Sequence, residues 1–162
     1  MSPHSRSRIM AMAVLAAIAL SPGVFPAAAA SLCLLASDDG RELARRELGP
    51  GNTFSLSFIH SVSKTPVTDS YKVDGGMIVQ TAEIFQAHGA GLPSNTADAG
   101  VTGWRHDDGR FIIDMRRPMG PIRLRVQAAY RNTLHIDGAN LPLASLGQQV
   151  LILASCHKDI TP

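Results

Sequence analysis

The chain has 162 residues, 45% of them hydrophobic and only 5% aromatic, with 15 Lys and Arg against 13 Asp and Glu. This length suits one domain with one hydrophobic core, and the sequence has no basic stretch with interleaved aromatic residues of the kind that binds nucleic acid. The first 30 residues contain two arginines and no acidic residue, which leaves 13 basic and 13 acidic side chains in residues 31–162. We therefore expect a charge-balanced domain that does not bind nucleic acid.

The first 30 residues have the pattern of a secretory signal peptide. Arg6 and Arg8 precede an unbroken apolar run over residues 9–20, and a series of alanines ends at Ala30. A positively charged start, an apolar centre and small residues before the cleavage site define such signals. The apolar run is shorter than the roughly 20 residues that span a membrane, which argues against a membrane anchor. We expect cleavage after Ala30 and a periplasmic or secreted protein with no membrane span.

Residues 31–162 read as a single β domain, because apolar and polar side chains alternate along them. Phe54, Leu56 and Phe58 are each separated by one residue, which places them on one buried face of a strand. Asp-Gly and Gly-Gly steps between such segments supply the positive φ angles of tight hairpins. We predict an all-β fold, an antiparallel sandwich or small barrel of about 8–10 strands. The predicted strands are residues 32–37, 54–60, 68–73, 77–87, 102–106, 110–116, 122–127, 132–136 and 149–155.

A few segments carry a less regular pattern. The final strand is apolar on both faces over residues 150–154, so we expect it at the centre of a sheet, and residues 32–35 read the same way. Residues 41–48 fit either a short helix or another strand, and residues 143–146 fit a short helical turn.

Cys33 lies in the first predicted strand, and Cys156 adjoins the last one. An even number of cysteines in an oxidising compartment favours a disulfide, which forms here if those strands are neighbours; two buried free thiols are the alternative. A lipid-modified Cys33 is a further alternative, but Leu32 stands where lipoprotein signals carry a small residue.

The most distinctive local sequence runs from Phe58 through His60, Ser61 and Val62 to Pro66-Val67, Asp69 and Tyr71, and a second one is Gly89-Ala90-Gly91-Leu92-Pro93. At these positions the chain resembles the bacterial domain-of-unknown-function family 1850. That family pairs F-x-H-S-V with P-V-x-E-x-Y and a later G-A-G-L-P loop, and the resemblance covers residues 54–93. Asp69 stands where the family usually has Glu, so any role that needs the reach of the longer side chain is in doubt.

The resemblance implies a place beside a membrane transporter. Members of the family are small exported or membrane-tethered domains, often encoded beside, or fused to, permeases of TAXI-type TRAP transporters, which import organic acids. We therefore expect an accessory or binding module that contacts the permease or its substrate-binding protein. The resemblance implies no reaction and no cofactor. A free-standing protein that binds a small carboxylate is the alternative function.

The residues themselves suggest one polar site. His60 continues the buried face of its strand, and an antiparallel return of the chain would bring Asp69 close enough to pair with it. Gly89 and Gly91 can adopt positive φ, so the loop could form an anion-binding nest facing His60 and Ser61. A structural histidine and a tight turn are the alternatives. The candidate site residues are His60, Ser61, Pro66, Asp69, Tyr71, His88, Gly89, Gly91 and Pro93.

Hydrolysis and metal binding are less well supported. His60, Ser61 and Asp69 are the residue types of a hydrolase, but neighbours on a strand point to opposite faces, so Ser61 would face away from His60. The chain has no G-x-S-x-G motif. Its histidines show no close ligand spacing, although His60, His88 and Asp69 could still converge. We expect no enzymatic activity and no metal site.

Overall fold

The structure is a computed structural model that describes residues 29–156. Apart from Ala29 and Ala30, the predicted signal peptide lies outside the described residues. The strands are β1 Ser31–Ala36, β2 Glu42–Glu47, β3 Thr53–Ile59, β4 Pro66–Asp74, β5 Met77–Phe85, β6 Val101–Asp107, β7 Arg110–Pro118, β8 Ile122–Arg125, β9 Thr133–Ile136, β10 Ala139–Pro142 and β11 Val150–Ser155. Two short 3₁₀ helices, η1 Ala128–Tyr130 and η2 Leu143–Leu146, complete the described elements.

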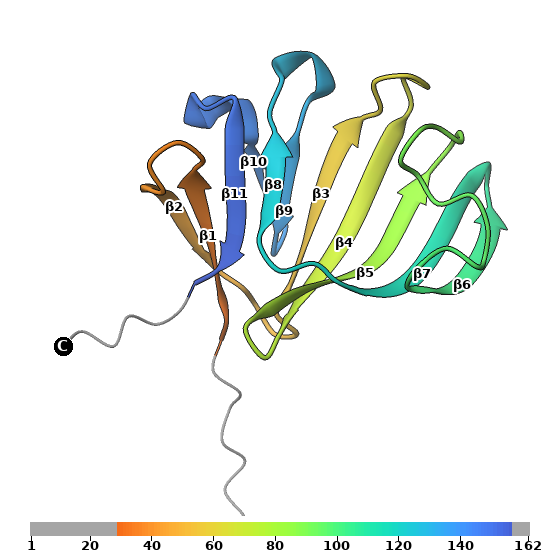
Figure 1. Cartoon of the computed structure of the whole chain (residues 1–162), viewed down its shortest axis with the longest axis horizontal. Helices are drawn as coiled ribbons and strands as arrows, with labels where there is room; N and C mark the ends of the chain where they lie inside the picture. Colours follow the sequence, from red (N-terminus) through yellow and green to blue (C-terminus); the bar gives the residue numbers. More distant parts are fainter. Residues whose placement is uncertain (1–28, 157–162) are drawn as a thin grey trace, which may run out of the picture.

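The strands form two antiparallel sheets that pack as a sandwich (Figure 1). The small sheet has the order β2-β1-β11-β8, and the large sheet has the order β10-β9-β3-β4-β5-β7-β6. The predicted all-β fold is confirmed, and of its two forms the sandwich is the correct one. No helix among residues 29–156 is long and apolar enough to cross a membrane.

Most predicted strands match observed ones, and the differences have local causes. Residues 41–48 contain strand β2, because β1 supplies an edge with which they can pair. The prediction missed β10, a strand of only four residues that ends in Pro142 and forms a hairpin with β9. β11 lies between β1 and β8, as its two apolar faces predicted.

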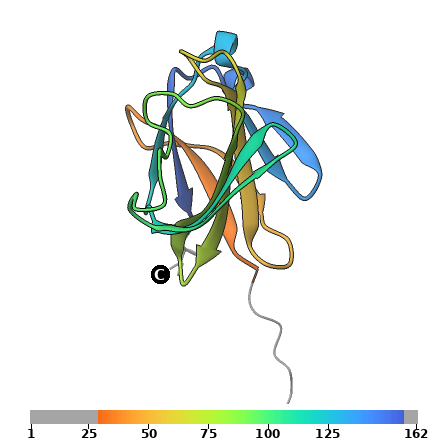
Figure 2. The same ribbon diagram turned by 90° about the vertical axis from the view of Figure 1, so that its right-hand side faces the viewer.

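The small sheet covers only part of the large one, so the core is divided. The main cluster lies between the sheets and includes Leu34, Leu56 and Leu153. Beyond it, β5, β7 and β6 extend away from the small sheet (Figure 1) and bury a second cluster around Phe85 and Ile113. Figure 2 looks onto this end of the molecule, where the β6–β7 hairpin and the β5–β6 connection lie nearest the viewer. Leu92 of that connection packs against the second cluster.

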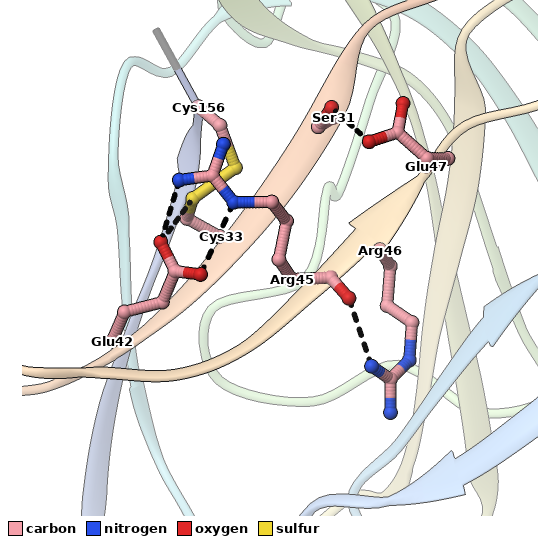
Figure 3. A network of polar contacts seen from close by, with 7 residues as sticks. All are labelled: Ser31, Cys33, Glu42, Arg45, Arg46, Glu47 and Cys156. Atoms are coloured by element: carbon pink, nitrogen blue, oxygen red, sulfur yellow. Dashed lines mark hydrogen bonds and ion pairs between the residues drawn. A yellow bond between two sulfur atoms is a disulfide. The ribbon is translucent and has the colours of Figure 1, made fainter. Parts of the chain in front are cut away.

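Cys33 and Cys156 form a disulfide, so the predicted pairing is confirmed in this structure. Cys33 lies in β1, and Cys156 directly follows β11, the neighbour of β1 in the small sheet. Figure 3 shows the bridge beside the ion pair of Glu42 and Arg45. Glu42 Oε2 lies 3.2 Å from Cys33 Sγ, a van der Waals contact, because a disulfide sulfur carries no proton. The bridge therefore closes almost the whole domain into one loop.

Removing this bridge should destabilise the domain. The cysteines are 123 residues apart, and cross-linking so long a segment restricts the unfolded chain. Replacing both cysteines by serine should lower the free energy of unfolding by about 3 kcal/mol in urea titrations, because the unfolded state regains its freedom. The small sheet should remain formed, since its ladder is independent of the bridge. Two alkylatable thiols in the unreduced native protein would contradict the disulfide itself.

Candidate functional site

His60 lies directly after β3, and backbone groups hold its ring from two sides. Nδ1 accepts hydrogen bonds from the N–H groups of Val62 (3.3 Å) and Ser63 (3.2 Å). Since Nδ1 accepts, the ring proton lies on Nε2, which donates to the carbonyl oxygen of Ala90 at 3.2 Å. The His60 side chain therefore links the β3–β4 turn to the β5–β6 connection by hydrogen bonds.

The glycine-rich loop lies against His60, as the sequence predicted. A Cβ on Gly89 would collide with Cε1 of the His60 ring, so only glycine fits at this position. The loop turns the carbonyl of Ala90 toward His60, and the N–H of Leu92 is used in a turn to Gly89. An anion-binding nest facing His60 is therefore not formed, because the group presented there is an acceptor.

The predicted pair between His60 and Asp69 is wrong. In the antiparallel register Asp69 lies opposite Leu56, four residues before His60. Its carboxylate instead accepts hydrogen bonds from the Tyr71 hydroxyl (3.3 Å) and from Gln80 Nε2 (3.2 Å). The sequence placed both residues on the correct face but could not fix how far apart the register sets them.

A bulge in β5 places a second acidic side chain, that of Glu83, next to Asp69. The register shifts between Gln80 and Ala82, so Gln80 lies opposite Tyr71 while Glu83 lies opposite Asp69. Without the bulge, Gln80 and Glu83 would point to opposite faces of the sheet. Both are buried, with exposed fractions of 4% and 5%. The inner face of the sheet thus carries two carboxyl groups next to each other.

Burial keeps these carboxyl groups protonated to unusually high pH. It raises the pKa of Asp69 to about 6, against the opposing effect of its two hydrogen bonds. It also raises the pKa of Glu83 to about 7, with a smaller contribution from the nearby charge of Asp69. Arg117 reaches this group only through Gln80, whose Oε1 accepts from Nη1 at 3.3 Å. The positive charge lowers both pKa values too little to cancel the effect of burial.

A cleft runs between β3 of the large sheet and β8, the edge strand of the small sheet; we call it the β3–β8 cleft. Its inner cavity, of about 210 Å³, is lined by Leu56, Ser57, Phe58, Asp69, Tyr71, Ile122, Leu124 and Asn132. Its outer cavity, of about 290 Å³, is lined by Phe58, Ile59, His60, Ser61, Leu124, Arg125, Gln127, Tyr130 and Asn132. The two cavities share three residues and therefore adjoin. His60 and Asp69 thus lie at opposite ends of one cleft. A larger, more polar hollow around residues 125–129 contains none of the motif residues.

Asn132 lines both cavities, and only the nitrogen of its side-chain amide makes no hydrogen bond within the described residues. The residue is only 7% exposed, and its Oδ1 accepts the N–H of Gln127 at 3.1 Å. Its Nδ2 has no hydrogen-bond partner in the part of the chain that the structure describes. No side-chain nitrogen or oxygen there is both fully buried and unpartnered, so Nδ2 keeps some contact with solvent. Asn132 lines both cavities, and its Nδ2 carries two N–H donors that make no hydrogen bond within the described residues.

The mouth of the cleft is positively charged. Arg125 lines the outer cavity, and no acidic side chain does. Lys64 lies with its Nζ 5.8 Å from the centre of the Tyr130 ring, which also lines this cavity. An anionic group would therefore be attracted to the mouth, while the walls of the cleft are mainly apolar.

The other candidate residues have structural roles. Pro66 pairs with Ile59 at the start of the β3–β4 ladder, and Tyr71 stacks on Phe54 with ring centres 5.0 Å apart. His88 packs against Phe111 in the second core cluster, with ring centres 4.4 Å apart. Among residues 29–156, no group of three acidic, histidine or cysteine side chains could hold a metal ion.

The remaining candidate site residues are Ser61, Gly91 and Pro93. Ser61 is exposed at the mouth of the cleft, and Gly91 has a positive φ of 89° in the glycine-rich loop, which Pro93 closes. Sequence reasoning missed Asn132 and Tyr130, which come to the cleft only through the packing of the sheets, and it read Arg125 only as a solvated strand residue.

The raised pKa values predict a protein that is more stable in acid than near neutrality. In the folded state the pKa values of Asp69 and Glu83 exceed their ordinary values of 3.8 and 4.5, so the folded protein holds more protons in this range. This stabilisation is complete below about pH 4 and is lost as the pH rises through about 6 and 7. We expect the free energy of unfolding to fall by about 2 kcal/mol across that window, as measured in urea.

The variant Glu83→Gln should show a clearly smaller decrease with pH. Glu47→Gln, which changes an exposed carboxylate, serves as the control and should behave like the parent protein. An unchanged pH dependence in Glu83→Gln would show that Glu83 titrates alike in the folded and unfolded states.

The comparison with protein families agrees with the motifs. Residues 54–143, more than half of the chain, match the family described as domain of unknown function DUF1850. The matched segment contains all three motifs and every residue that lines the β3–β8 cleft, and it leaves out β1, β2, β11 and the disulfide. No curated protein and no solved structure shows significant similarity to the chain. On the strength of the family match, the chain belongs to the DUF1850 family.

Proposed function

We propose that the protein is an exported, non-enzymatic binding module that holds a small organic acid in the β3–β8 cleft. The observation that carries this proposal is the Asn132 amide, which lines both cavities and whose Nδ2 has no hydrogen-bond partner among the described residues. A donor that is nearly buried and makes no hydrogen bond within the protein is available to a ligand that accepts its hydrogen bonds. A carboxylate is the acceptor that makes such bonds strongest.

The charges and shape of the cleft support the same class of ligand. Arg125 at the mouth would attract an anion, and the apolar walls formed by Phe58 and Leu124 would pack against its carbon chain. The volumes of the two cavities lie at or below the lower end of the range for small-molecule sites, roughly 300–1,000 Å³. The ligand is therefore a short-chain acid, which Asn132 and Arg125 would bind by its carboxylate.

Export of the protein is supported by two features. The disulfide between Cys33 and Cys156 is of a kind that persists in oxidising compartments, which include the bacterial periplasm. The leader of basic, apolar and small residues supports secretion through a cleaved signal peptide. We propose that the mature domain works in the periplasm or outside the cell.

Binding can be tested with a series of short-chain carboxylates, from acetate to hexanoate, in thermal-shift and calorimetric titrations. A ligand at 100 times its dissociation constant should raise the free energy of unfolding by about 2.7 kcal/mol. Asn132→Asp keeps the oxygen that accepts from Gln127 but replaces the amide donors with negative charge. This variant should bind the same acid at least about tenfold more weakly.

Arg123→Gln is the matched control for Arg125→Gln, because Arg123 lies on the same strand but does not line the cleft. Only the Arg125 variant should lose affinity. Equal affinity of Asn132→Asp and the parent protein would place the ligand elsewhere.

The family resemblance supports a further step, in which the module contacts a TRAP-type transporter permease or its substrate-binding protein. One surface feature favours such a contact. Val62, in the family motif, is 69% exposed on the turn beside the mouth of the cleft. A large apolar side chain at that place suits a partner that receives or delivers the ligand.

This association can be tested by affinity purification from solubilised membranes of the source bacterium. We expect a TRAP permease or its substrate-binding protein to be retained, and Val62→Asp should abolish that retention because a carboxylate cannot enter an apolar contact. Val62→Ala keeps the surface apolar and serves as the control. If neither transporter component is retained by the parent protein, the association is wrong.

A further inference from the structure

Ser57, His135 and Asn140 form a hydrogen-bonded line across three neighbouring strands of the large sheet. Ser57 Oγ lies 2.7 Å from His135 Nε2, and His135 Nδ1 lies 2.6 Å from Asn140 Oδ1. The strands β3, β9 and β10 are adjacent, and Asn140 is in register with His135. We call these three residues the Ser57 relay.

The chemistry of Asn140 fixes the direction of the hydrogen bonds. An amide oxygen can only accept, so His135 Nδ1 carries the proton and donates it to Asn140 Oδ1. Nε2 is then unprotonated and accepts the hydrogen bond from the Ser57 hydroxyl. A serine, a histidine base within hydrogen-bond reach and a third group that orients the histidine are the parts of an activated nucleophile.

The relay is open to solvent. Ser57 alternates with Leu56 and Phe58, whose side chains belong to the core side of the sheet, so its hydroxyl lies on the outer face. Ser57 and His135 are half-buried and Asn140 is exposed. His135 also borders a hollow of about 430 Å³, whose wall includes Ser55, Ser70 and Thr81. Of the relay residues only His135 lines this hollow, so a small acyl compound there would lie beside His135, whose Nε2 is 2.7 Å from the Ser57 hydroxyl.

We propose that Ser57 is a reactive nucleophile that accepts an acyl group from an ester or thioester. Ser57 is also among the residues that line the inner cavity of the β3–β8 cleft, but its hydroxyl bonds to His135 on the other face of the sheet. The site differs from a hydrolase built on His60 and Ser61, since both ring nitrogens of His60 are bonded to backbone groups. The Ser57 relay thus has the geometry of an activated serine. The residues His60, Ser61 and Asp69 match such a site only in residue type.

The transfer balances without a further reactant. Ser57 Oγ bonds to the carbonyl carbon while its proton passes to His135 Nε2. The bond from that carbon to the leaving oxygen or sulfur then breaks, and the leaving group takes the proton from His135 as an alcohol or thiol. Asn140 holds the ring in position throughout, and the product is an ester on Ser57.

A fluorophosphonate is the direct probe of this reactivity. It forms a bond between Ser57 Oγ and phosphorus, fluoride leaves, and His135 takes the proton. In the disulfide-bonded protein, mass spectrometry of peptides should find the label on Ser57 well before it appears on Ser63, whose hydroxyl bonds to the hydroxyl of Thr65 and not to a histidine in the described part of the chain. Labelling should slow as the pH is lowered, because a protonated imidazole cannot accept the proton.

The variants separate reactivity from folding. His135→Gln should slow labelling of Ser57 on the order of 100-fold, the contribution of a positioned base. Asn140→Asp should accelerate it, because a carboxylate stabilises the imidazolium, whereas Asn140→Leu should slow it. Thr68→Val is the control, since Thr68 is in register with Ser57 on the same face and lies outside the relay and the hollow.

Thermal unfolding of each variant reports whether the fold is intact, and Asn140→Leu provides the test if His135→Gln does not fold. Labelling of Ser57 no faster than that of Ser63, or unchanged labelling in folded His135→Gln, would overturn the proposal.

Discussion

The structure depends on one packing constraint: a sheet of four strands faces a sheet of seven. The inner face of the large sheet must be kept from water, but of its described strands only β9, β3, β4 and the start of β5 contribute buried residues to the core cluster that it shares with the small sheet. At the far end, the β5–β6 connection covers the remainder and creates the second core cluster. The β3–β8 cleft lies along β8, the edge strand of the small sheet, where the cover that the small sheet provides ends.

The polar residues of the interior lie at that same boundary. Asp69, Gln80 and Glu83 lie between the two apolar clusters of the large sheet. The bulge in β5 places both Gln80 and Glu83 inside, which a regular strand could not do. Because burial disfavours the charged form, the pKa values of Asp69 and Glu83 are raised. The two carboxyl groups therefore keep their protons to higher pH instead of being buried as unpaired charges.

Strand β3 connects the two proposed sites because it presents different chemistry on its two faces. Its inner face carries Leu56 and Phe58 and ends at His60, so it forms one wall of the cleft. Its outer face carries Ser57, which bonds to His135 of the neighbouring strand β9. His60 is held rigidly by the backbone, whereas Ser57 is held by a histidine whose other nitrogen bonds to a side chain. The first arrangement orders a loop, and the second one prepares a hydroxyl for reaction.

The sequence by itself determined the fold class, most of the strands and the contact of His60 with the glycine-rich loop. These follow from local rules, since alternation places residues such as Phe54 on one face and glycines such as Gly89 permit a close approach. The tertiary structure alone decided the register that separates His60 from Asp69, the bulge that brings Glu83 inside, and the sheet packing that carries Asn132 to the cleft. Each of these depends on pairings between distant segments, and a shift of one residue changes the face of every side chain, which no local pattern can fix.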